Sequence, residues 1–346
     1  MLKVDSSSTI LGIACLAAWS FFPLLRALPD PQGTDFYPLW IGLRTVIAGG
    51  NPYSPSTAEL LRNTWQVHKI AQVADVVGYP LPVLLILAPL SLLTLQQAVV
   101  AWCLLLVAAI GIFSIAFGNK KISVFVMPLL FFPAFHAVVI KTSTVLWLGL
   151  IGCLVIAIRN NRSVMAGFCI ALLPGKPQAG LIVALGVVIW AIREQHYKIL
   201  ASTGCWIVLL WGGSLLVQPN WPSDWWRTVA EYQDQVMLVS LMPEGLLVPL
   251  FSLGLSWLAF AAAIQTVAFP VNDIYCSLPL LVGWMQMRPL IALLGIGASW
   301  SAILLYPNPN HPLVLWTVIL LPYCVGALIN RLVNLSRENA SGSPEQ

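Results

Sequence analysis

Long apolar runs recur along almost the whole chain, and they constrain its fold more than any other feature. Hydrophobic residues make up 59% of the 346 residues and charged residues only 9%, whereas a soluble domain carries about a quarter charged residues. A membrane-spanning helix needs about 20 apolar residues, and a chain inside lipid must satisfy its backbone hydrogen bonds internally, which favours helices. The sequence therefore predicts an all-α protein, a polytopic transmembrane bundle of roughly ten to twelve helices.

The distribution of polar residues defines a membrane domain and a tail. Residues 1–335 are expected to form a single integral-membrane domain, and residues 336–346 a polar, disordered tail. The first apolar run, Thr9–Leu28, follows Lys3 and is not followed by a small-residue cleavage site at the usual spacing. We interpret it as an uncleaved first helix rather than a signal peptide.

Two polar stretches are predicted to be outer loops. The first, residues 29–78, is expected to contain surface helices at Tyr37–Gly49 and Pro55–Val76, of which the former is amphipathic and suited to the membrane interface. The second, residues 218–243, contains the Trp-rich segment Asn220–Gln235, which we expect to be a loop whose tryptophans anchor it at the interface.

Basic residues set the expected orientation in the plasma membrane. Lysine and arginine favour the cytoplasmic side of a membrane. The residues predicted to lie on that side are Lys3, Lys120, Lys121, Arg159, Arg162, Arg193, Lys198, Arg331 and Arg337. The multi-pass chain then presents Lys141 and Lys176 at the outer tips of two hairpins. Pro174 and Pro177 flank Lys176, so the run Met165–Ile192 is predicted to break there into two half-length helices. Chemistry is expected on the extracytoplasmic face.

Asp35 is the main candidate for acid–base chemistry. It lies beside aromatic residues in the first outer loop of a chain with only 13 acidic residues. Partial burial would raise its pKa toward the range in which a carboxylate accepts a proton usefully. The alternatives are a helix cap and an ion-pair partner for Arg44.

Two lysines are candidates for binding an anion such as a phosphate. Lys176 lies between two expected half-helices, one of which directs its N-terminus at the junction, an arrangement that suits anions. A lysine in the membrane interior costs several kcal/mol unless it is paired or hydrated. The alternative is a lysine that reaches to the interface. Lys141, in the segment HAVVIKTST, is a weaker case of the same kind.

Other outer-loop residues have an ordinary and a functional interpretation. His311, in YPNPNHP, is either a solvated histidine or part of an active site. Asp273 precedes an apolar run, where an N-cap is the ordinary role. Trp225 and Trp226 are either interface anchors or a platform on which a sugar ring stacks.

Metal, disulfide and nucleic-acid functions have little support. No DxD or HExxH motif occurs, and the loop that holds Asp30 and Asp35 offers too few oxygen ligands for a divalent ion. The seven cysteines show no CxxC spacing, so neither a disulfide framework nor a zinc site is expected. The net charge of +4 comes from small clusters near helix ends and gives no sign of nucleic-acid binding.

Several short motifs follow one another in an order typical of a known family. They are Asp35-Phe36-Tyr37, Gly50-Asn51-Pro52-Tyr53, Tyr79-Pro80-Leu81-Pro82, Ala88-Pro89-Leu90, Ala166-Gly167, Lys176-Pro177, and Pro270, Asp273 and Tyr275 before Leu278-Pro279-Leu280. Over most of residues 35–281 the chain resembles the family-87 glycosyltransferases of the GT-C superfamily, the polyprenyl-phosphate-mannose-dependent mannosyltransferases.

The resemblance implies a GT-C-like helix bundle with its active site at the outer face. It implies an inverting transfer of a hexose, specifically mannose, from a polyprenyl-phosphate donor to a glycolipid or glycan acceptor, with no cofactor and no divalent metal. Asp35 corresponds to the family's catalytic base. The other candidates are assigned to the donor phosphate or sugar: Lys176, Arg227, His311, Lys141, Tyr37, Arg44, Asp273, Tyr275 and Trp226.

Two other functions remain open at this point. Broken helices and membrane lysines also fit a carrier or flippase for a lipid-linked or anionic substrate. An inactive scaffold subunit is the third interpretation, because the chain has Lys141-Thr142-Ser143 where the family usually shows Gly-Gln with a nearby Asn. A single cavity that holds Asp35, Lys176 and His311 favours the transferase, and a path open to both sides favours the carrier.

Overall fold

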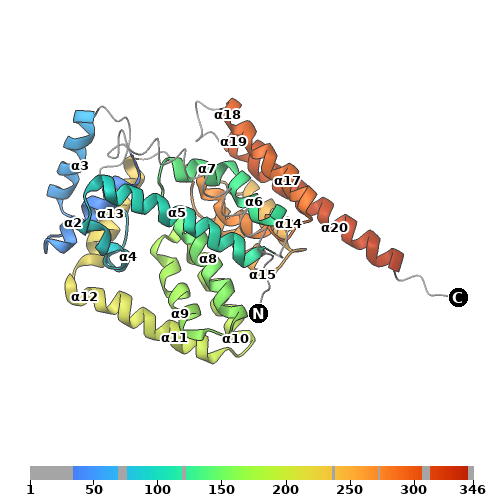
Figure 1. Ribbon diagram of the computed structural model, residues 1–346, viewed down its shortest axis with the longest axis horizontal. Helices are drawn as coiled ribbons and strands as arrows, with labels where there is room; N and C mark the ends of the chain where they lie inside the picture. Colours follow the sequence, from blue (N-terminus) through green and yellow to red (C-terminus); the bar gives the residue numbers. More distant parts are fainter. Residues whose placement is uncertain are drawn as a thin grey trace.

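The described part of the chain is helical throughout (Figure 1). A computed structural model describes residues 34–68, 76–118, 122–235, 238–271, 273–305 and 312–341. Within these ranges the only β-pairing is an isolated antiparallel bridge between Val239 and Val271. The all-α prediction is confirmed for this part of the chain. The expected first helix, Thr9–Leu28, lies outside the described residues.

The helices follow one another with short connections. The first group is α2 (Phe36–Ile47), α3 (Pro55–His68), α4 (Leu81–Leu87), the 3-10 helix η1 (Ala88–Leu92), α5 (Leu95–Phe117), α6 (Ile122–Leu130), α7 (Phe132–Val139) and α8 (Thr144–Arg159). The second group is α9 (Ser163–Leu172), η2 (Leu173–Gly175), α10 (Pro177–Arg193), α11 (Tyr197–Ile207), the π-helical η3 (Val208–Gly212), α12 (Gly213–Val217) and α13 (Trp221–Gln235). The last group is η4 (Glu244–Leu246), α14 (Leu247–Ser252), α15 (Trp257–Ala268), η5 (Ile274–Leu280), α16 (Leu281–Trp284), α17 (Pro289–Ala298), η6 (Ser299–Ser301), α18 (Ala302–Leu305), α19 (Pro312–Leu315), η7 (Trp316–Leu320) and α20 (Leu321–Ser341).

Three helical stretches are long and apolar enough to cross a membrane: Leu95–Phe117, Tyr197–Val217 and Trp316–Arg337. The other apolar helices of the described residues are shorter, so a bundle of ten to twelve spanning helices is not confirmed. Proline is one cause of the shortening, because it removes a backbone donor and clashes with the preceding turn. The run Ile122–Ile140 breaks at Phe131, and α7 begins at Phe132 with Pro133 as its second residue.

The predicted break at Lys176 is confirmed. Helix α9 ends at Leu172, the 3-10 turn η2 contains Pro174, and α10 starts at Pro177. Proline is well suited to the first helical position because its missing N–H has no intrahelical partner there. Lys176 is therefore held at a junction between two helices rather than on the face of one.

Helices α5 and α8 approach each other closely through small residues. A Cβ at Gly149 would lie 2.5 Å from the Cβ and 2.7 Å from the Cα of Ala109. At Gly152 it would lie 2.7 Å from the Cα of Phe113. Glycine at these positions lets two apolar backbones pack directly, as is common between helices in membranes. Helix α5 also contacts the turn that precedes α8, because Trp102 Nε1 donates a hydrogen bond to the Lys141 carbonyl.

Helix α2 differs from the prediction of an interfacial surface helix. All eight residues from Phe36 to Leu43 are buried, so both faces of its first two turns are packed. Phe36 stacks on Trp102 of α5 with ring centroids 4.9 Å apart. Only the last turn, from Arg44, is exposed. The prediction failed because the apolar residues of the first two turns, such as Leu39 and Leu43, pack into the core of the protein.

Two polar segments are more helical than expected. The segment Asn220–Gln235 was predicted to be a loop, but residues 221–235 form α13. Helix α20 extends to Ser341, into the stretch predicted to be a disordered tail. Asp224 lies in the first turn of α13, where a negative charge complements the helix dipole.

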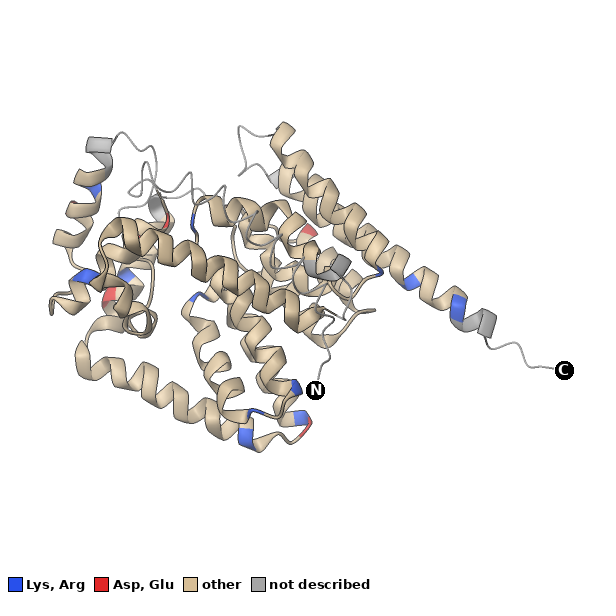
Figure 2. Cartoon of the chain, viewed as in Figure 1, with Lys and Arg blue, Asp and Glu red and all other residues tan. Residues whose placement is uncertain are grey.

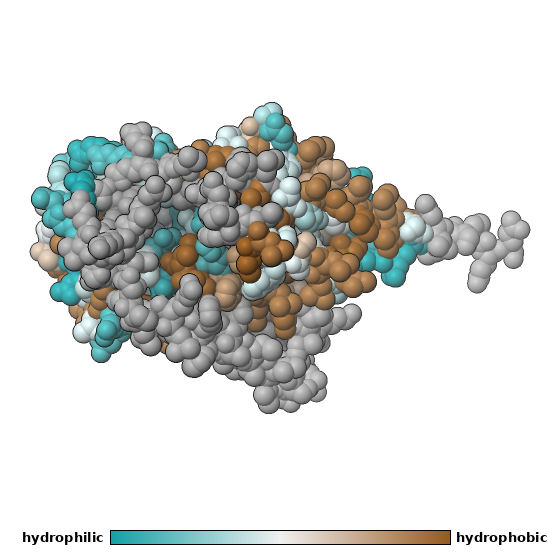
Figure 3. Space-filling model, turned by 90° about the horizontal axis from the view of Figure 1, so that it is seen from above, coloured by the Kyte–Doolittle hydropathy of each residue, from teal (hydrophilic) through white to brown (hydrophobic). Residues whose placement is uncertain are grey.

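Charged side chains are confined mainly to helix ends, which leaves the helix bodies apolar (Figure 2). Arg159 ends α8 and Arg193 ends α10. Seen from above, hydrophilic surface gathers at the end that holds α2 and α3, and hydrophobic surface covers the end that holds α17 and α20 (Figure 3). This distribution is that of a membrane protein with one more polar end.

Candidate active site

Asp35 is placed by its backbone rather than by its side chain. It precedes α2, and its N–H donates a hydrogen bond to the carbonyl of Ile140, 3.1 Å away. The carboxylate makes no capping hydrogen bond to α2, so the helix-cap interpretation does not hold. Arg44 is not its ion partner either, since the Arg44 guanidinium lies over the Trp40 ring, 5.0 Å from its centroid. The half-buried carboxylate instead makes a hydrogen bond with the Thr142 side chain.

The turn between α7 and α8 supplies much of the site. Lys141 has a φ of 61°, a left-handed conformation uncommon for a residue with a side chain. Two hydrogen bonds hold it: Trp102 Nε1 donates to the Lys141 carbonyl at 2.9 Å, and Lys141 Nζ donates to the Val139 carbonyl at 3.1 Å. The turn presents the buried hydroxyls of Thr142 and Ser143.

Lys176 meets these two hydroxyls. Its Nζ donates to Ser143 Oγ at 3.0 Å and to Thr142 Oγ1 at 3.3 Å. It also lies 5.7 Å from the centroid of the Tyr275 ring, within cation–π range. Tyr79 OH donates to the same Ser143 Oγ at 2.9 Å. A lysine with 8% of its surface exposed is thus held by neutral partners and keeps an ammonium charge beside the Asp35 carboxylate.

A histidine–carboxylate pair borders the cluster. His136 Nε2 lies 3.1 Å from Asp273 Oδ2, with both side chains largely buried. Asp273 Oδ1 also accepts a hydrogen bond from the N–H of Tyr275 at 3.4 Å, which confirms the N-cap role expected for Asp273. The same carboxylate thereby fixes α7, through His136, to the start of η5.

Burial and neighbouring charges set the protonation of the central pair, which lies outside the three candidate spans. Burial is the main cause that raises the pKa of Asp35 to about 6, and the negative charge of Asp273 raises it further. Three neighbours lower the pKa in part: the charge of Lys176, a hydrogen bond with Thr142, and His136. Burial lowers the pKa of Lys176 to about 8, against the attraction of Asp35. Near pH 7 the pair is a carboxylate that binds protons readily and a cation.

A comparison with known protein families matches residues 78–329 to glycosyltransferase family 87. The match covers well over half of the chain. The protein belongs to glycosyltransferase family 87. The matched range contains Tyr79, His136, Ser143, Lys176 and Asp273, whereas Asp35 precedes it. Comparisons with curated proteins and with solved structures found no match.

Some residues that the sequence predicts for this glycosyltransferase's site lie apart from the cluster. Tyr37 is buried, and its hydroxyl is 3.3 Å from Thr64 Oγ1. Arg227 is largely exposed and pairs with Asp224 at 3.2 Å. Arg44 is exposed at the end of α2. His311 lies outside the described residues. The structure thus brings together Asp35, Lys176, Asp273 and Tyr275, and Lys141 lies in the adjoining turn with its Nζ on the Val139 carbonyl.

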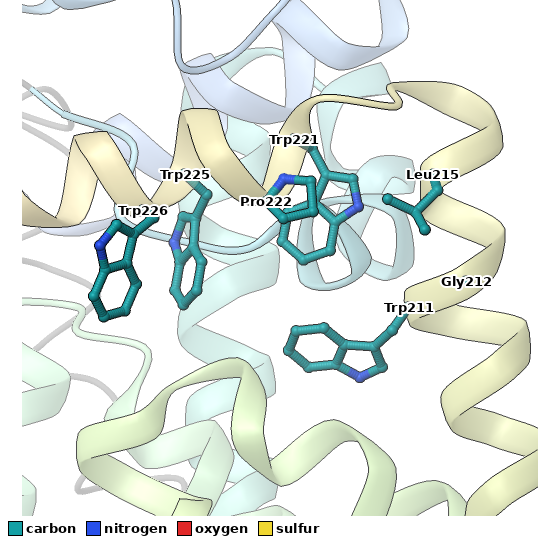
Figure 4. Close-up of a pocket in the computed structure, with 7 residues that line it drawn as sticks. All are labelled: Trp211, Gly212, Leu215, Trp221, Pro222, Trp225 and Trp226. Atoms are coloured by element: carbon teal, nitrogen blue, oxygen red, sulfur yellow. The ribbon is translucent and has the colours of Figure 1, made fainter.

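Trp226 lines a groove at another place in the glycosyltransferase. The groove has a volume of about 600 Å³ (Figure 4). We call it the tryptophan groove; its lining residues are Trp211, Gly212, Leu215, Trp221, Pro222, Trp225 and Trp226. The first three come from η3 and α12 and the others from α13, so the two walls belong to different helices.

Sequence reasoning missed part of the glycosyltransferase's cluster. His136 received no role, Tyr79 entered as part of the motif Tyr79-Pro80-Leu81-Pro82, and Thr142 with Ser143 were regarded as a departure from the family pattern. The available signal was the density of polar residues in HAVVIKTST between two apolar runs. Among the described residues, no three His, Cys, Asp or Glu side chains gather into a potential metal site.

Proposed function

We propose that this family-87 glycosyltransferase is an inverting hexosyltransferase with Asp35 as its general base. The donor is a polyprenyl-phosphate hexose, with mannose as the first candidate, and the acceptor is a glycolipid or glycan at the extracytoplasmic face of the plasma membrane. The observation that carries the proposal is the half-buried Asp35 carboxylate, with a pKa near neutrality, facing the charge of the buried Lys176.

The proposed reaction needs one proton transfer and one displacement at the anomeric carbon. An Asp35 oxygen takes the proton of an acceptor hydroxyl, and the acceptor oxygen forms a bond to the anomeric carbon from the face opposite the phosphate. The bond between that carbon and the phosphate oxygen breaks, and its electron pair stays on the phosphate. A base whose pKa lies close to the working pH combines adequate ionisation with useful basicity.

Lys176 is suited to the charge that develops on the phosphate. Its ammonium makes two hydrogen bonds to neutral hydroxyls, which orient it without neutralising it. A fixed cation in a water-poor site stabilises developing negative charge more strongly than a solvated one does. Tyr275 lies over the Lys176 ammonium and Asp273 acts on Asp35, and both, with Lys141 of the adjoining turn, are proposed to shape the donor site. Arg227, Tyr37 and Arg44 lie outside the cluster, and we assign them no part in this reaction. Trp226 lines the tryptophan groove instead.

Family membership and the gathering of Asp35 and Lys176 favour the transferase over the carrier and scaffold interpretations. Thr142 and Ser143, which prompted the scaffold interpretation, hold the candidate cation. The departure from the family pattern therefore lies in the residues that orient Lys176.

The test is transfer of radiolabelled sugar from a panel of polyprenyl-phosphate donors to a membrane lipid extract by the purified protein, with EDTA present. We expect product from the mannosyl donor, of inverted anomeric configuration, and equal rates with and without EDTA. Product with retained configuration would contradict the role of Asp35 as a base. Product from another hexosyl donor alone would change the assigned sugar, and a rate abolished by EDTA would require a metal.

A further inference from the structure

The tryptophan groove has a mainly apolar lining, and the indole N–H groups of two of its four tryptophans are engaged elsewhere. Trp211 Nε1 donates to the Ala171 carbonyl at 2.9 Å, and Trp225 Nε1 donates to the Gly78 carbonyl at 3.1 Å. Trp221 Nε1 is buried and has no hydrogen-bond partner among the described residues. The rest of the lining is mostly hydrocarbon and aromatic surface, including the exposed Leu215 and Trp226. A sugar ring buried there would lose most of its hydrogen bonds to water. A hydrocarbon chain would lose none.

The groove opens at the end of a candidate membrane span. Its first wall belongs to the stretch Tyr197–Val217, of which only 17% is buried within the protein. Leu216 is 89% exposed and Val217 58% exposed next to the lining residue Leu215. Because this apolar surface is of the kind that faces lipid, a chain can pass from the bilayer to the groove without crossing water.

Hydrogen bonds to the segment Gly78–Tyr79 link the wall of the groove to the cluster around Lys176. Trp225 donates to the carbonyl of Gly78, and the next residue, Tyr79, donates to the Ser143 hydroxyl that also receives Lys176 Nζ. Helix α4, which begins two residues after Tyr79, packs against η3 and α12. The chain from Gly78 to α4 therefore connects the wall of the groove to the candidate phosphate site.

We infer that the tryptophan groove binds the isoprenoid chain of the lipid-linked donor and so directs its phosphate to Lys176. The inference rests on the proposed function, since it assigns a subsite to the same donor. Trp211 lies on one wall, and Trp225 and Trp226 project from α13 on the other, so the chain would lie against these rings (Figure 4). The groove selects for chain length, because each further isoprene unit buries more apolar surface.

Two adjacent glycines provide a matched test. Gly212 lines the groove, and a Cβ there would meet only the Val208 side chain at 4.0 Å. Gly213 does not line the groove, and a Cβ there would meet nothing within 4 Å. Gly212→Leu fills the groove, whereas Gly213→Leu makes the same change in the same helical stretch outside it. Native mass spectrometry in nanodiscs then gives the Kd of geranylgeranyl phosphate and of the shorter geranyl phosphate for each form.

The inference predicts that Gly212→Leu weakens geranylgeranyl phosphate binding about tenfold and geranyl phosphate binding much less. Gly213→Leu is expected to bind both as the wild type does. Trp226→Ser, at a 69% exposed position, serves as a second groove variant with little effect on folding. Three results would each overturn the inference. The first is equal weakening of binding in both leucine variants, and the second is unchanged binding in Gly212→Leu and Trp226→Ser. The third is equal affinity of the wild type for geranylgeranyl phosphate and geranyl phosphate. The probes carry no sugar, so a failure to transfer sugar leaves this test intact.

Discussion

Replacing Asp35 by asparagine is expected to stabilise the protein while it removes the proposed base. The pKa of Asp35 rises from 3.8 to about 6 on folding, and this net shift already includes the attraction of Lys176. Above pH 6, where Asp35 is ionised in the folded protein, a shift of this size lowers the free energy of unfolding by about 3 kcal/mol. This is an upper value, because the side chain keeps some exposure to water.

The sign follows from the direction of the shift. A carboxyl group with a raised folded-state pKa binds protons more tightly when folded, so ionisation destabilises the fold increasingly as pH rises from about 4 to 6. Asparagine stays neutral and avoids this loss. The stabilisation by Asp35→Asn is therefore largest above pH 6, about half as large at pH 5, and small near pH 4.

Thermal unfolding in detergent measures this difference. About 3 kcal/mol corresponds to a rise in Tm of roughly 4 °C for a chain of this length at pH 7.5, and about half that at pH 5. Glu59→Gln, which neutralises an exposed carboxylate on α3, is the control and should leave Tm unchanged. An Asp35→Asn variant with an unchanged or lower Tm at pH 7.5, or with a difference independent of pH, would refute the argument that Asp35 is held in a desolvated site.

Three further predictions concern rate and packing. The kcat/KM of the wild type should fall below pH about 6 as Asp35 is protonated, and a profile flat to pH 5 would contradict this. Lys176→Met should lower kcat/KM about 100-fold. It should also move the pH at which kcat/KM falls to a higher value, because Lys176 lowers the pKa of Asp35. An unchanged pH profile would show that the two groups do not interact. Gly149→Ala should lower the free energy of unfolding by roughly 1–3 kcal/mol, because the added methyl group would contact Ala109. Gly204→Ala, which has open space around it, should not lower it. Equal Tm values for the two variants would contradict the close packing of α5 on α8.

Features set by local chemistry could be predicted from the sequence. The break around Lys176 follows from Pro174 and Pro177, whose effect on a helix does not depend on distant residues. The N-cap role of Asp273 is local in the same way. The apolar composition likewise indicated helices in a membrane protein.

Features set by distant contacts could not be predicted. The burial of α2 depends on Trp102, which lies far along the chain from Phe36. The pairing of Asp35 with the turn before α8 depends on a backbone bond to Ile140, which no side-chain pattern encodes. His136 became part of the site only through its contact with Asp273, at another position distant in sequence.

The most direct test of the account compares sugar transfer by the wild type and by Asp35→Asn, with donor binding measured on the same preparations. Removing a general base lowers the rate by about 10²–10⁴-fold, while Lys176 and its hydroxyl partners remain to bind the donor. We therefore predict product from the wild type, turnover in the variant lower by at least about 100-fold, and a donor Kd within about threefold of the wild type. Turnover in Asp35→Asn within about tenfold of the wild type would contradict the central role assigned to Asp35.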